Sequence, residues 1–212
     1  MTTLLIPDSG PLFSLAAGGL LDLLNHFKVG ITDVVKQETI DRGALPQASV
    51  EAKRIHDFYQ AGKAHVEILP TQVRRDLRTL RDANPDTPTP PNVGELSIQS
   101  LLIHLQVQAF ESRPLVLFED SWFLRNAAAL AKPCIALSTQ AFLVNAQALG
   151  WLASAEAARE AIAKVRPMAF GEAVALPGGT SARRGPRSRK RRSLRPRPRA
   201  LAPCAAARAD RW

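Results

Sequence analysis

The sequence predicts an α/β fold, a three-layer sandwich in which helices flank both faces of a central parallel β-sheet. Short apolar runs alternate along the chain with longer amphipathic patterns, which is typical of parallel strands joined by helical crossovers. Two of the apolar runs, "LLIPDS" and "VLFEDS", also end alike, in a carboxylate and a serine that lead into a helical pattern. These endings indicate strands that stop at the same edge of the sheet.

Five apolar runs have the length and composition of buried strands. They lie at 3–8, 29–32, 65–69, 114–120 and 134–137. Ser9 is expected to cap the first helix, which ends at Gly18 and Gly19, and Asp33 is expected to cap the third. The four prolines in 85–92 predict a loop. Helical patterns lie at 9–19, 20–27, 34–42, 49–63, 71–84, 93–110, 121–131, 138–152 and 154–165.

The charge distribution separates a domain at 1–176 from a basic tail at 177–212. The chain has a formal net charge of +9, but twelve of its Lys and Arg residues and only one acid follow Pro177. The first 177 residues therefore hold 16 basic and 18 acidic residues, so overall basicity does not indicate that the domain binds nucleic acid. The tail, rich in Arg, Pro and Ala, is predicted to be disordered. Three explanations of the tail are open: an arm that holds RNA, a solvated extension, or the product of a shifted reading frame.

Cysteine usage and hydropathy indicate the compartment. Two cysteines are too few for a disulfide framework, which favours a reducing cytoplasm. The first residues lack a basic segment and a long apolar run, so we expect neither a signal peptide nor a membrane span.

Four acidic residues are the candidate catalytic and metal-binding set: Asp8, Glu38, Glu95 and Asp120. Asp8 and Asp120 follow strands, whereas Glu38 and Glu95 lie near helix ends that we expect at the same sheet edge. Several carboxylates in one cleft repel each other unless a cation compensates. An all-oxygen set suits Mg²⁺ or Mn²⁺ better than Zn²⁺. Such an ion would activate water for attack on a phosphate.

Each acid also has a simpler explanation. Asp8 and Asp120 could serve only as negative charges at helix N-termini, worth about 0.3–1 kcal/mol each. Glu95 stands three residues after Asn92, which is the spacing of a capping box. Glu38 could be a solvated charge on a helix face. The pattern formed by all four favours the metal site.

Three sequence blocks carry a resemblance to a known family. The blocks are "LLIPDSGPLFSLAAGGLLDLLNHFKVGITDVVKQETI", "NVGELSIQSLL" and "LVLFEDSWFLRNAAALAKPCIALSTQAFLVNAQALG". In order and spacing they resemble PIN-domain proteins, many of which are VapC-type toxins. The resemblance implies a PIN-like sandwich whose acids map onto Asp8, Glu38, Glu95 and Asp120, with Glu119 as an auxiliary.

By this resemblance the protein is expected to be a metal-dependent endoribonuclease, the toxin of a toxin–antitoxin pair. Its expected partners are an RNA substrate, an antitoxin protein and a second copy in a homodimer. The alternative is a catalytically inactive PIN-like module that binds RNA or protein. A receiver or phosphatase is disfavoured, because the first strand is followed by neither an acidic pair nor a DxD motif.

Weaker candidates lie outside this set. None of the histidines has metal-ligand spacing, and His104 falls nine residues after Glu95, nearly opposite it on a helix. Four arginines repeat at three- and four-residue intervals and would form one basic face of a helix. This face would either bind phosphates or simply be solvated. The arginines are Arg74, Arg75, Arg78 and Arg81. Trp122 could stack on a base, whereas Phe123 is expected in the core.

Overall fold

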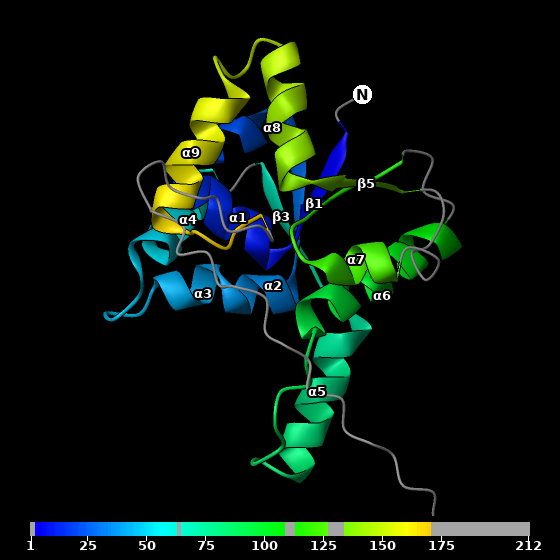
Figure 1. Cartoon of the computed structure of the whole chain (residues 1–212). Coiled ribbons are helices and arrows are strands. Elements are labelled where there is room, and N and C mark those ends of the chain that lie inside the picture. The colour runs from blue at the N-terminus through cyan, green and yellow to red at the C-terminus, as the bar shows by residue number, and fades with distance from the viewer. Residues whose placement is uncertain (1–2, 63–64, 109–112, 127–133, 171–212) are drawn as a thin grey trace, which may run out of the picture. The chain divides into compact units, whose positions relative to one another are not determined.

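The computed structural model describes residues 3–62, 65–108, 113–126 and 134–170, and these contain a five-stranded, all-parallel sheet flanked by helices (Figure 1). The predicted α/β fold class is confirmed. The strands are β1 (Leu4–Pro7), β2 (Lys28–Thr32), β3 (Val66–Leu69), β4 (Leu115–Phe118) and β5 (Ile135–Ser138). The predicted tail at 177–212 lies outside the described residues.

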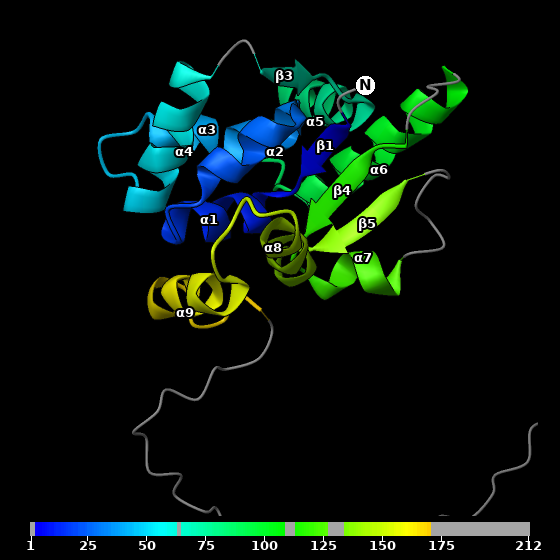
Figure 2. The same cartoon turned by 90° about the horizontal axis from the view of Figure 1, so that it is seen from above.

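The strand order is β3-β2-β1-β4-β5, so the chain winds outward from β1 in both directions (Figure 2). β1 pairs with β2 through Leu5 and Val29, and with β4 through Pro7 and Leu117. The order therefore reverses between β1 and β4. In doubly wound α/β sheets, ligands bind beyond the carboxyl ends of the strands at this reversal.

The described helices flank the sheet and have between 4 and 15 residues. They are α1 (Ser9–Ala17), the 3₁₀ helix η1 (Leu21–His26), α2 (Asp33–Glu38), α3 (Ile40–Gly43), α4 (Val50–Ala61), α5 (Gln72–Ala83), α6 (Val93–Val107), α7 (Ser121–Arg125), α8 (Thr139–Ala148) and α9 (Ala155–Val165). Helix α1 packs against α4 and α9 on one side of the sheet, and α6 lies on the other with α5 against it (Figure 1).

Apolar side chains from both layers form the main core around β1 and β4, where Leu5, Ile6 and Leu117 are fully buried. A second, smaller cluster lies away from it and joins three helices through Val34 of α2, Leu77 of α5 and Val93 of α6. This small cluster holds the highly polar helix α5 against α2 and α6, because Leu77 is the only buried residue of α5.

Several helix boundaries differ from the sequence predictions. Asp8, not Ser9, occupies the N-cap position of α1, and Thr32, not Asp33, caps α2 by accepting a hydrogen bond from the Val35 N–H. Asp33 instead accepts hydrogen bonds from the backbone and hydroxyl of Thr71. The helix predicted at 34–42 is broken at Thr39, whose φ of −118° and ψ of −72° depart from helical values. The segment predicted as helix at 20–27 is a 3₁₀ helix.

Candidate active site at the strand reversal

Asp8 and Asp120 follow the two strands between which the sheet order reverses. The Asp8 backbone N–H donates to the Leu117 carbonyl at 2.9 Å, which extends the pairing of β1 with β4 to the site itself. A pocket of about 600 Å³ opens at this edge. Its lining includes Asp8, Glu95 and Asp120, so three of the four predicted residues border one pocket.

Asp8 is the most deeply buried acid of the set, with 4% of its surface exposed. Its Oδ1 makes no hydrogen bond in the part of the chain that the structure describes. Asp8 stands at the N-cap position of α1, where a negative charge is favoured, but its side chain makes no capping hydrogen bond. A buried carboxylate oxygen without a donor is costly unless a proton or a cation compensates it.

The surroundings of Asp8 disfavour its charged form. Burial is the main cause, and together with the charge of Glu95 it raises the pKa of the Asp8 carboxyl to about 7. A hydrogen bond from the Ser9 backbone opposes the shift, and the charges of Glu38 and Asp120 add to it. All four predicted acids therefore interact electrostatically at Asp8.

Glu38 and Glu95 approach Asp8 from different helices. Glu38 is the last residue of α2, and burial raises its pKa, while a hydrogen bond from the Ser9 side chain lowers it. Glu95 stands in the first turn of α6, and burial, followed by the charge of Asp120, raises its pKa. Asn92 makes no side-chain capping bond, so the Asn92 half of the predicted capping box is absent.

Gly94 allows the carboxylates of Asp8 and Glu38 to approach each other, and the sequence did not identify it as a site residue. A Cβ atom placed on Gly94 would lie 3.1 Å from Glu38 Oε2 and 3.3 Å from Asp8 Oδ1. The two carboxylates thus meet over a residue without a side chain. The signal in the sequence was its position directly before Glu95 at the start of a helix.

Asp120 is more exposed than Asp8, with 53% of its side chain accessible. It caps α7 by accepting a hydrogen bond from the Trp122 N–H at 2.7 Å, which places its charge at a helix N-terminus as the simpler explanation expects. Arg125 Nη2 lies 4.0 Å from the same oxygen. Asp120 also lines the pocket around Asp8.

Glu119 has a role that the sequence did not reveal. Its Oε1 accepts a hydrogen bond from Ser14 Oγ at 2.6 Å, and its Oε2 lies 3.1 Å from Arg166 Nη1. Arg166 also donates to the Gly10 carbonyl at 2.8 Å and to the Ser14 hydroxyl. Burial nevertheless outweighs these bonds and raises the pKa of Glu119. The expected auxiliary ligand is therefore committed to an internal network.

The donor set fits a divalent metal ion in its chemistry, because it is all oxygen and includes the unpartnered buried Oδ1 of Asp8. The positions of these donors fit one ion less well than their chemistry does. Within residues 3–62, 65–108, 113–126 and 134–170, no group of three or more His, Cys, Asp and Glu side chains is arranged to hold one ion. Glu38 in particular borders a second cavity instead of the pocket around Asp8.

The other candidates are distributed away from this site. His56 Nδ1 lies 3.1 Å from the Ile40 carbonyl, and His26 stacks on Trp151, which are structural contacts. Phe123 is buried as predicted, and Trp122 packs edge-on against it.

No helix among the described residues is long and apolar enough to cross a membrane. Comparison of the chain with protein-family models, curated proteins and solved structures gives no match.

Proposed function

We propose that the protein is a metal-dependent ribonuclease that uses Asp8, Glu38, Glu95 and Asp120 to hold Mg²⁺ or Mn²⁺. The observation that carries the proposal is Asp8, a buried carboxylate with an unpartnered oxygen and three further acids acting on it at the strand reversal. Such an arrangement costs stability, and residues that cost stability in this way concentrate at functional sites.

Three of these residues have separate parts in the proposed reaction. Asp8 provides a buried carboxylate whose charge a bound cation would compensate, and the Ser9 side chain orients Glu38 beside it. Asp120, at the pocket rim, faces the substrate side. When bound there, Mg²⁺ or Mn²⁺ lowers the pKa of a coordinated water and stabilises charge on the phosphate.

A second candidate function is an inactive binding module with the same fold. It is favoured by the separation of the acids, no three of which are arranged for one ion in the described part of the chain. The expected antitoxin, homodimer and cytoplasmic location stay predictions. The antitoxin rests on the PIN-domain resemblance, the homodimer on the isologous interfaces common among α/β domains, and the cytoplasmic location on cysteine usage. Growth after induced expression, with and without the neighbouring open reading frame, tests the toxin prediction.

RNA cleavage distinguishes the two candidates. Asp120→Asn is the most informative variant, because it removes the charge but not the helix cap. Asparagine caps helices as well as aspartate does, so α7 should be preserved. With Mn²⁺ and a labelled single-stranded RNA, the wild type should cleave and Asp120→Asn should lose about a hundredfold or more in rate. Asp86→Asn, on the exposed loop before α6, should cleave like the wild type. An RNA left uncleaved by the wild type would favour the inactive module. Equal rates of cleavage by Asp120→Asn and the wild type would contradict the role of Asp120.

A further inference from the structure

A second cavity, of about 450 Å³, lies beside the carboxylate site and is bordered by α2, α3 and α5. Its apolar floor is the small cluster of Val34, Leu77 and Val93. Its polar lining includes Glu38, so one of the four acids faces both the Asp8 carboxylate and this cavity.

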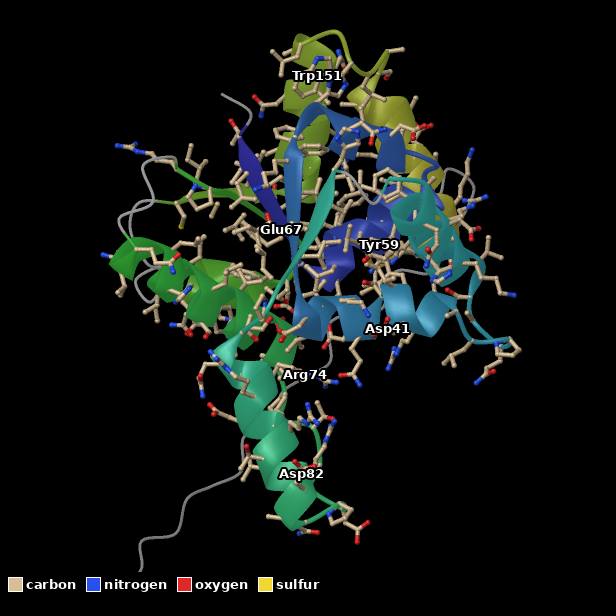
Figure 3. All side chains as sticks on the ribbon, turned by 180° about the vertical axis from the view of Figure 1, so that it is seen from behind. Asp41, Tyr59, Glu67, Arg74, Asp82 and Trp151 are labelled. Carbon is tan, nitrogen blue, oxygen red and sulfur yellow. The ribbon has the colours of Figure 1, made fainter. Side chains whose placement is uncertain are left out.

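The cavity separates the arginines of α5 into two pairs. Arg74 and Arg81 stand on either side of Leu77, are half-buried, and line the cavity. Arg75 and Arg78 are exposed and do not line it. Figure 3 shows Arg74 at the end of α5 next to the sheet. The four arginines predicted to share one basic face thus fall into two pairs that differ in burial.

The guanidinium groups of this cavity make no close ion pair in the part of the chain that the structure describes, although the charge of Arg42 acts on Glu38 and lowers its pKa. Arg42 joins Arg74 and Arg81 in the lining, and within the described residues none of the three makes an ion pair with a carboxylate. Arg74 donates to Gln37 and Arg81 donates to Thr89 Oγ1 at 2.6 Å, both neutral acceptors.

The balance of charge in the cavity is positive. Asp41, an acid in the lining, is paired with Lys36 at 2.5 Å. This pairing leaves Glu38 as the acid that faces three guanidinium groups. Half-buried arginines with neutral partners favour an anionic ligand, and a guanidinium binds phosphate oxygens with two parallel hydrogen bonds.

We propose that this cavity binds backbone phosphates of single-stranded RNA, with Arg74 and Arg81 as the principal contacts and Arg42 as the third. The proposal rests on the proposed function, since Glu38 connects the cavity to the carboxylates that would cut the strand. A recess of this size admits the phosphates of a single strand, and phosphate contacts position a nucleic acid without reading its sequence.

The test is fluorescence anisotropy of a fluorescein-labelled twelve-nucleotide oligouridine with the full chain in EDTA, which prevents metal-dependent cleavage. Arg74→Ala/Arg81→Ala is compared with Arg75→Ala/Arg78→Ala, which removes the same charge from the same helix. The first pair should weaken binding about tenfold or more. It should also make the plot of log affinity against log salt shallower by about 1.4, as expected for two phosphate contacts. The second pair should weaken binding less than about threefold.

Equal losses in the two double variants, or no loss in the first, would overturn the cavity assignment. Arg74→Lys/Arg81→Lys guards against misfolding, because it keeps the charge and should retain part of the affinity if the thermal unfolding curve is unchanged. Binding of oligothymidine but not oligouridine would overturn the assignment to RNA. A wild type that binds the RNA in EDTA but leaves it uncut with Mn²⁺ would contradict the proposed function and leave this subsite standing.

Discussion

Arg166 Nη1 lies 3.1 Å from Glu119 Oε2, which connects the residue after α9 to the residue after β4. Arg166 also reaches the Gly10 carbonyl and the Ser14 hydroxyl of α1. The network therefore links the segments that follow β1 and β4. Glu119 and Arg166 line the same pocket as Asp8 and Asp120.

Replacing Arg166 should destabilise the fold. In Arg166→Ala, Glu119 keeps a side chain only 9% exposed but loses its cation, which should lower the free energy of unfolding by about 2–4 kcal/mol. Urea denaturation measures the change. The matched control is Lys28→Ala, which breaks an exposed ion pair with Glu67 and should cost less than about 1 kcal/mol. Similar losses in both variants would contradict a buried network.

The burial of Asp8 predicts an unusual dependence of stability on pH. Its pKa rises from 3.8 to about 7 on folding, so the folded chain binds this proton more tightly than the unfolded chain. The resulting stabilisation is complete below pH 4 and is lost as the pH rises through 7. The loss is up to about 4 kcal/mol by linkage. Glu38, Glu95 and Glu119 have raised pKa values and act in the same direction.

Asp8→Asn should therefore be more stable than the wild type at pH 8 in EDTA, and nearly equal to it at pH 4. Urea denaturation at both pH values checks this, with Asp86→Asn as the exposed control. A variant that is less stable than the wild type at pH 8 would show that the Asp8 charge is compensated within the folded chain.

Gly94→Ala tests whether the carboxylates act together. The new methyl group would crowd Glu38 Oε2 and Asp8 Oδ1, which must each shift by a few tenths of an ångström. We expect Mn²⁺ affinity to fall about tenfold, while helix propensity raises the stability of α6 by up to about 1 kcal/mol. Calorimetry and thermal unfolding measure the two effects. Leu96→Ala, in the same helical turn, is the control. Unchanged Mn²⁺ affinity in Gly94→Ala would separate Glu38 from the Asp8 site.

The sequence predicted the parts of this site that depend on periodicity and strand order. Alternating apolar runs predict a parallel sheet, and matching strand endings place Asp8 beside Asp120. The roles of Glu119 and Arg166 were not predictable in this way. Their partners lie far apart in the chain, so no local spacing signals them.

Local chemistry also misled the prediction at α2. Thr32 and Asp33 are both good capping residues, and the sequence alone does not distinguish them. The choice depends on tertiary structure, because Thr71 donates two hydrogen bonds to Asp33 and leaves Thr32 to cap the helix. The arginines of α5 were similarly indistinguishable until the packing of Leu77 showed which of them face inward.

The most direct measurement of the central claim is calorimetric titration of the full chain with Mn²⁺ at pH 8. We predict one ion bound per chain, and an affinity at least about tenfold weaker in Asp8→Asn, with Asp86→Asn unchanged. The absence of binding to the wild type, or equal affinity in Asp8→Asn, would contradict a metal site built on Asp8.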